Sequence, residues 1–284
     1  MKLRTFSMLV LVLALSLSAV SARADAVTNL AADNFAVLAY STVTNTGSTT
    51  ISGSGNVGVS PGSAITDEVD ISLGTGAFYT TATSLAGTGQ TDATAVYGIL
   101  QGLASSGTNL TGENLGGLTL TPGIYSFASS ASLTGTLTLN FGGASNEAIV
   151  IDTGSTLVTA SGSSVVFEDT GTNDSVYWAV GSNATLGTST SFEGNIISNG
   201  ASTDAIETGA TIGCGSDIAL KGEVSLDANT IDTGCNGATT TILGGLAPRT
   251  PTPTPEPSTF ALFSSGLLGL GFLAFRKSRV SPLI

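Results

Sequence analysis

Apolar and polar residues alternate along many short segments between residues 25 and 246. In one segment, Leu137, Leu139 and Phe141 fall on one face, and hydroxyl or amide side chains fall on the other. Residues 222–227 alternate in the same way. A period of two is the pattern of a strand with one buried face, and the Gly, Asn and Asp residues between segments are typical of turns. This region is therefore predicted to be all-β.

The spacing of these segments favours a solenoid. The segments at Thr136 and Thr156 lie 20 residues apart, and the two cysteines, Cys214 and Cys235, lie 21 apart. Spacings near 20 suit one coil of a three-sided β-helix, in which each coil adds a rung. Adjacent rungs are about 4.8 Å apart, so equivalent residues fall near the Cα separation that a disulfide needs. We therefore predict a solenoid with a Cys214–Cys235 disulfide; a β-sandwich is the alternative, because the repeat is irregular.

One segment breaks the β pattern and has the period of a helix. Its apolar stripe, at spacings i, i+3, i+4 and i+7, consists of Val96, Ile99, Leu100 and Leu103. Thr91 suits the N-cap position, so the predicted helix spans residues 92–104. Gly98 and Gly102 weaken such a helix, and we expect them to permit close approach to a sheet.

The N-terminus has the features of a secretory signal peptide over residues 1–24. Lys2 and Arg4 precede an apolar run over residues 8–20, which is short for a membrane span. Cleavage after a small-x-small pattern would start the mature chain at Asp25, with an uncleaved anchor as the alternative.

The C-terminus carries a linker and a second hydrophobic segment. Residues 247–258 alternate Thr and Pro over most of their length, which favours an extended, semi-rigid spacer. Residues 259–284 contain a hydrophobic run that ends at Phe275 and is followed by three basic residues. The run is long enough to cross a bilayer, and the basic cluster should stay cytoplasmic. The domain over residues 25–246 is therefore expected to be exported, at the cell surface or extracellular.

Charge excludes several classes of partner. The formal net charge is −12, and 19 of the 20 acidic residues lie between Asp25 and Asp232. Such a surface repels nucleic acid and anionic lipid headgroups. The chain has no histidine, so the commonest general base and the commonest metal ligand are both missing. We expect no cofactor and no metal site.

A β-helical polysaccharide lyase or glycosidase is the enzymatic alternative. A lyase needs a basic residue, and Lys221 is the one basic side chain outside the terminal segments and the linker. A glycosidase needs two carboxylates, for which Glu193, Asp217 or Glu223 can be nominated, but their spacing selects none of them. The chain is therefore predicted not to be an enzyme.

Several segments together resemble the family of bacterial and fungal ice-binding proteins known as DUF3494. These segments are residues 35–47, 55–62, 115–125, 133–139, 154–166 and 176–188, the second of which reads Gly-Asn-Val-Gly-Val-Ser-Pro-Gly. The resemblance implies a right-handed, discontinuous β-helix of triangular section with one long α-helix packed alongside. It also implies adsorption to ice through one flat face, inhibition of ice recrystallisation and, in some members, adhesion to ice.

The C-terminus resembles the PEP-CTERM sorting signal, with Pro255, Glu256 and Pro257 ahead of the hydrophobic run and the basic tail. The resemblance implies cleavage near this motif by an exosortase-type enzyme, so that the membrane segment anchors the chain transiently. A permanent single-span anchor is the alternative.

Adsorption to ice requires a flat, rigid and uncharged surface of small side chains. Thr offers a hydroxyl and a methyl group on a stiff β-branched side chain, so ordering it against ice costs little entropy. The candidate ice-binding residues are Thr156, Thr159, Thr185, Thr188, Thr190, Thr208 and Thr211.

An exported adhesin that binds polysaccharide or neighbouring cells, without ice activity, is the alternative function. Asp67, Glu68 and Asp70 could then hold Ca²⁺, although a run of acids in a loop is also commonly just solvated.

Overall fold

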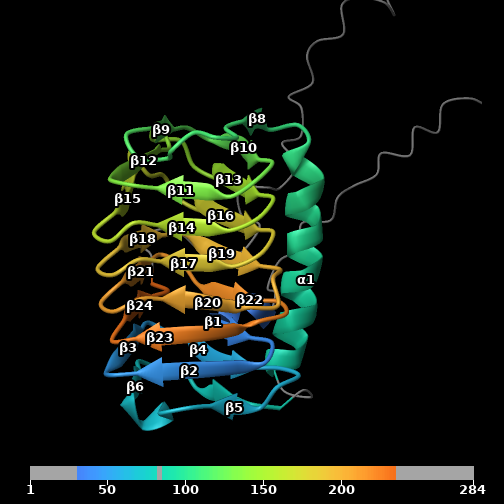
Figure 1. Ribbon diagram of the computed structural model, residues 1–284, viewed down its shortest axis with the longest axis vertical. Coiled ribbons are helices and arrows are strands. Elements are labelled where there is room, and N and C mark those ends of the chain that lie inside the picture. The colour runs from blue at the N-terminus through green and yellow to red at the C-terminus, as the bar shows by residue number, and fades with distance from the viewer. Residues whose placement is uncertain (1–30, 82–84, 235–284) are drawn as a thin grey trace, which may run out of the picture. The chain divides into compact units, whose positions relative to one another are not determined.

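The computed structural model describes residues 31–81 and 85–234. In this part of the chain, three parallel β-sheets form the sides of a solenoid, and α1 (Leu85–Ala104) lies along the outside of one sheet (Figure 1). Two short 3-10 helices, η1 (Ala31–Asn34) and η2 (Glu68–Asp70), complete the elements. The predicted three-sided solenoid with one helix alongside is confirmed.

Each sheet takes at most one strand from a coil, and the three sheets have nine, seven and eight strands. Sheet A has the order β7 (Phe78–Tyr79), β4 (Asn56–Val59), β1 (Phe35–Ala39), β22 (Asp217–Ala219), β19 (Asn195–Ser198), β16 (Ser175–Val180), β13 (Ala148–Thr153), β10 (Gly123–Phe127) and β8 (Thr108–Asn109). Sheet B has the order β11 (Ala131–Leu133), β14 (Leu157–Thr159), β17 (Ala184–Leu186), β20 (Thr203–Ile206), β23 (Glu223–Asp227), β2 (Thr42–Thr46) and β5 (Ala64–Ile65). Sheet C has the order β6 (Ile71–Leu73), β3 (Thr49–Ser52), β24 (Thr230–Asp232), β21 (Thr211–Gly213), β18 (Ser191–Glu193), β15 (Ser164–Glu168), β12 (Thr136–Asn140) and β9 (Thr119–Leu120).

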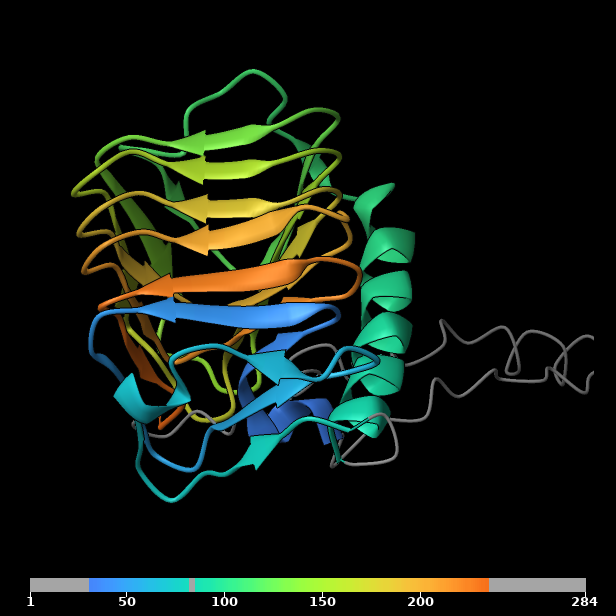
Figure 2. The ribbon, with the colours of Figure 1, turned by 60° about the horizontal axis from the view of Figure 1, so that its bottom comes forward.

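The chain enters the solenoid partway along it rather than at one end. On one side, β1, β2 and β3 pair with β22, β23 and β24 of the last coil; on the other, they pair with β4, β5 and β6. After these coils, α1 runs along sheet A and the coils restart at β8 (Figure 1). Figure 2 shows the blue strands of the first coils directly beside the orange strands of the last. The β-helix is therefore discontinuous in sequence but continuous in space.

Two layers of apolar packing hold these elements together. The interior of the solenoid is filled by alternate residues of all three sheets, and the rings of Trp178 and Phe192 lie 4.8 Å apart within it. The outer face of sheet A packs against α1, where Val96 and Leu100 meet Tyr177. Strands of sheet A are thus buried on both faces, which explains the continuous apolar sequence of β16.

The helix α1 begins at Leu85 rather than at residue 92, and the glycine that allows close approach to sheet A is not one of the two predicted. Thr91 is not an N-cap: it lies inside α1 and donates a hydrogen bond to the Gly87 carbonyl. Leu85 is the one large apolar residue in the first two turns of α1, so no apolar stripe predicts them. Gly89 gives the close approach to sheet A, because a Cβ there would lie 3.0 Å from the Phe35 ring. The expectation for Gly98 and Gly102 is wrong, since nothing lies within 4 Å of a Cβ at either position.

Several predicted features fall partly or wholly outside the described residues. Cys214 is disulfide-bonded, and the one other cysteine of the chain, Cys235, lies beyond the described part. The predicted signal peptide, linker, sorting motif and hydrophobic run also lie outside it. Over residues 31–81 and 85–234, no helix is long and apolar enough to span a bilayer.

Candidate functional site

The outward side of sheet B carries a row of small, uncharged side chains. Successive strand pairings align one residue per coil across six strands. We call this set the sheet B row; it consists of Ser132, Val158, Thr185, Ala205, Ser225 and Thr44. Residues on either side of each member point into the buried core. The alternation of the strands therefore produces a regular line of hydroxyl and methyl groups.

A second line of outward residues lies along the border of sheet B at which the chain arrives from sheet A. The Thr156 hydroxyl donates to the Ser130 hydroxyl oxygen over 2.8 Å. Further along, the Glu223 carboxylate accepts hydrogen bonds from Thr203 (2.6 Å) and Thr42 (3.3 Å). The one carboxylate in this line is thus held between two threonines of neighbouring coils.

The opposite border of sheet B, at the turns that lead to sheet C, is more acidic. Thr208 donates a hydrogen bond to the Asp227 carboxylate, and Glu207 is exposed nearby. Thr188 is exposed in the turn that follows β17. Carboxylates on this border belong to the coils of β5, β20 and β23, so the coils of β11, β14 and β17 present no charge on sheet B.

The seven candidate threonines do not lie on one surface. Thr156 and Thr185 face outward on or beside sheet B, Thr188 and Thr208 occupy turns between sheets B and C, and Thr211 faces outward on sheet C. Thr159 and Thr190 are 3% and 1% exposed, and their hydroxyl oxygens lie 2.8 Å apart. These two cannot touch ice, because both side chains point into the solenoid.

Sequence reasoning also missed most of the sheet B row. The predicted ice-binding set contains only Thr185 of this row, because it was selected from threonines of the later coils rather than from residues in register across the strands. The alternation of Leu157, Val158 and Thr159 contains the missing signal: the apolar Leu157 faces inward, so Val158 must face outward and Thr159 inward.

Sheet C has a similar hydroxyl row but a less even surface. The row consists of Ser72, Thr50, Thr230, Thr211, Ser191, Ser164 and Thr136. The outward residues beside it include the carboxylates of Glu193 and Asp232. Moreover, β15 and β18 are in register only at Ser164 and Ser191, so the sheet is interrupted there. Sheet B is therefore the more regular of the two sheets that α1 leaves uncovered.

Two carboxyl groups lie inside the solenoid rather than on a surface. Asp204 and Asp217 are both fully buried, and they lie close enough for the charge of one to affect the other. Asp204 also accepts hydrogen bonds from the Ser198 hydroxyl and from the Ala184 backbone N–H. Burial raises the pKa of Asp204 to about 7 and raises that of Asp217 well above its usual range. The pair therefore retains a proton at neutral pH.

The carboxylates nominated for glycoside cleavage occupy three separate environments. Asp217 is buried, Glu223 is held by threonines on sheet B, and Glu193 lies on sheet C. They do not form a facing pair. In the described residues, no three acidic or thiol side chains gather closely enough to hold a metal ion, and Asp67, Glu68 and Asp70 are no exception.

Comparison with known proteins gives the family. A family profile described as "Ice-binding-like" matches residues 37–232. The chain belongs to this family. A second profile, the PEP-CTERM protein-sorting motif, matches residues 253–279.

Relatives and solved structures agree with this membership. The chain is 41% identical over 276 residues to an ice-binding protein of Nostoc sp. (strain HG1), covering 96% of both chains. It resembles the crystal structure of an ice-binding protein from an Antarctic biological consortium, with a TM-score of 0.66, 36% identity, and 72% and 90% of the two chains covered. It also resembles the ice-binding protein of the Antarctic ascomycete Antarctomyces psychrotrophicus, with a TM-score of 0.65, 31% identity, and 73% and 98% coverage.

Proposed function

We propose that this member of the ice-binding family adsorbs to ice through the sheet B row. The proposal rests on one observation: the outward surface of sheet B is uncharged across the coils of β11, β14 and β17, where each coil contributes one small residue to the row. Backbone pairing fixes neighbouring rungs about 4.8 Å apart. Short side chains with few rotamers lose little freedom on contact, so a rigid array of this kind can order water in a lattice that merges with a crystal.

The other two sides of the solenoid fit ice less well. Sheet A is covered by α1, as Figure 1 shows. Sheet C carries Glu193 and Asp232 beside its hydroxyl row, and strongly hydrated carboxylates oppose the ordered water that ice contact needs. Sheet B carries its carboxylates only toward one end, where threonines hold those of Glu223 and Asp227.

Family membership supports ice binding over the alternative of a polysaccharide or cell adhesin, and over an enzyme. The Nostoc relative and the two solved structures are ice-binding proteins by name, and the Nostoc match covers nearly the whole chain. Asp217 is buried and Glu193 and Glu223 lie on different sheets, so the three carboxylates nominated for glycoside hydrolysis do not pair with one another.

The proposal is tested by placing one long charged side chain on each of two sides of the solenoid. Thr185→Lys places it in the middle of the sheet B row, and Thr50→Lys places it in the hydroxyl row of sheet C. We expect Thr185→Lys to abolish inhibition of ice recrystallisation and crystal shaping, and Thr50→Lys to retain both. Circular dichroism checks that both variants are folded. Full activity in Thr185→Lys would refute sheet B as the ice-binding surface.

We further propose that the chain is exported through the signal peptide over residues 1–24 and sorted through the PEP-CTERM segment. The match to that motif supports processing by an exosortase-type enzyme near Pro255, Glu256 and Pro257, with the run over residues 259–275 entering the membrane before cleavage. Mass spectrometry of the protein recovered outside its host cells should give a mature N-terminus at Asp25 and a C-terminus near the motif. Recovery of the intact C-terminus would instead indicate a permanent anchor.

A further inference from the structure

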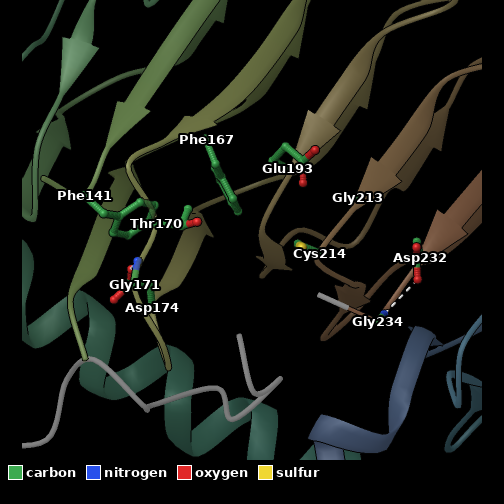
Figure 3. A pocket seen from close by; sticks show the side chains of 10 residues that line it. All are labelled: Phe141, Phe167, Thr170, Gly171, Asp174, Glu193, Gly213, Cys214, Asp232 and Gly234. Carbon is green, nitrogen blue, oxygen red and sulfur yellow. Dashed lines mark hydrogen bonds between the residues drawn. The ribbon is translucent and has the colours of Figure 1, made fainter. Parts of the chain in front are cut away.

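Sheet C contains a hollow of about 310 Å³ where long coils meet short ones (Figure 3). Equivalent residues are 27 positions apart between Val158 and Thr185, but 20 apart between Thr185 and Ala205. The extra residues of the longer coil, which runs from Val158 to Thr185, extend β15 and the turn after it. β15 therefore projects past β18, and the space beneath this projection is left open.

The two walls of the hollow differ in chemistry. On one wall, Phe141 and Phe167 pack edge to face with ring centroids 5.6 Å apart. On the other wall, Glu193 and Asp232 come from strands on either side of Gly213, as Figure 3 shows. A Cβ at position 213 would lie 2.7 Å from both carboxylate oxygens of Glu193. The lack of a side chain at Gly213 is what allows the Glu193 carboxylate to lie there.

This wall carries negative charge that the described residues do not balance. Glu193 is partly buried, and its carboxylate has no hydrogen bond or ion pair to any residue in the ranges 31–81 and 85–234. Burial and the nearby charge of Asp232 raise the pKa of Glu193 to about 7. Lys221 is the one basic residue in those ranges, and it does not line the hollow. A cation from outside the described fold would stabilise the charged form of a partly buried carboxylate in this position.

We propose that the hollow binds a guanidinium group. A guanidinium is a planar cation that can donate two parallel hydrogen bonds to the Glu193 carboxylate while its face lies on the Phe167 ring. Its weak hydration suits a site that is partly apolar, whereas an ammonium ion is more strongly hydrated. Asp174, the third acid of the lining, is already used, since its carboxylate accepts hydrogen bonds from two backbone N–H groups. The site is separate from sheet B and independent of ice.

The test uses two ligands of similar shape, one of which is a cation and the other neutral. The purified full-length protein is titrated at pH 8 with N-butylguanidinium and with neutral N-butylurea, by calorimetry. We expect saturable binding of the guanidinium and none of the urea. Glu193→Gln should weaken binding at least tenfold, and Gly213→Ala should do the same by displacing the carboxylate. Glu113→Gln, at an exposed acid elsewhere, should change the affinity less than twofold. Equal binding of both ligands, or unchanged binding by Glu193→Gln, overturns the proposal.

Absence of saturable binding of N-butylguanidinium by the wild-type protein also overturns the proposal. Unchanged ice activity in Glu193→Gln would keep this result distinct from the test of sheet B.

Discussion

The hydroxyl oxygens of Thr159 and Thr190 lie 2.8 Å apart inside the solenoid, at the corner where sheet B turns into sheet C. Thr159 also accepts a hydrogen bond from the Gly187 backbone N–H, and Thr190 donates to the Ala160 carbonyl. The pair thus ties together two adjacent turns. These threonines stabilise the edge of the candidate ice-binding surface without being part of it.

The first prediction separates this structural role from ice contact. Thr159→Val keeps the shape of the side chain but leaves the Gly187 N–H and the Thr190 hydroxyl without their partner. Loss of a buried hydrogen-bond partner costs about 1–3 kcal/mol, so the urea midpoint should fall. Inhibition of recrystallisation near 0 °C, where the domain is still folded, should match the wild type. Unchanged stability together with lost ice activity would instead place Thr159 on the ice surface.

The second prediction concerns Val158, an exposed apolar member of the sheet B row. Val158→Lys should raise the protein concentration needed to inhibit recrystallisation by about tenfold or more, which corresponds to at least 1.4 kcal/mol of binding free energy. Val158→Thr should retain activity, because it has the same branched shape and adds a hydroxyl. An equal loss in both variants would show that this position tolerates no change, and that charge is not the cause.

Local alternation predicted the strands but not which threonines they expose. A period of two shows which residues share a face of the strand. It does not show which face points inward until one apolar residue has been assigned to the core. Leu157 fixes that register for Val158 and Thr159, and the inward placement of Thr159 then follows. The Thr190 hydroxyl is buried by a turn rather than by a strand, so no periodic pattern could have found it.

Sequence patterns did not predict the contacts between segments that are far apart in the chain. Pairing of β1 with β22 joins Val37 to Asp217, which are 180 residues apart, and nothing local specifies it. The family resemblance supplied the discontinuous arrangement instead. The hollow on sheet C depends on a difference in length between neighbouring coils, which an irregular repeat conceals.

The third prediction compares two glycines of α1. Gly98→Ala should stabilise the domain by about 0.5–1 kcal/mol, because the position is open and Ala favours a helix. Gly89→Ala should be less stable than Gly98→Ala, since its Cβ would lie 3.0 Å from Phe35 and 3.1 Å from Leu38, which are both buried. Thermal melts of the two variants test the difference. Equal melting temperatures would mean that α1 can move away from sheet A without cost.

The fourth prediction is that the domain becomes less stable as the pH rises from about 4 to above 7. Asp152, Glu193, Asp204 and Asp217 all have a pKa in the folded protein above that of the unfolded chain, with burial as the main cause, and the values for the first three are about 6, 7 and 7. Below pH 4 both states are protonated at these groups, so their contribution to stability is fully present. As the pH rises past 4, the unfolded chain loses these protons first, so the unfolded state becomes more stable relative to the folded one. Each unit of pKa difference is worth about 1.4 kcal/mol at the fully buried Asp204 and Asp217, and less at the partly exposed groups, where solvent screens the charge.

Urea unfolding at pH 5 and pH 8 measures this effect, and the midpoint should be higher at pH 5. Asp217→Asn is the informative variant, because the amide keeps the shape of the buried side chain but does not titrate. Its midpoint should change less between the two pH values than that of the wild type. Glu113→Gln, an exposed acid, serves as the control and should leave the difference unaltered. A wild-type midpoint that is higher at pH 8 would show that the buried pair is not protonated in the folded state.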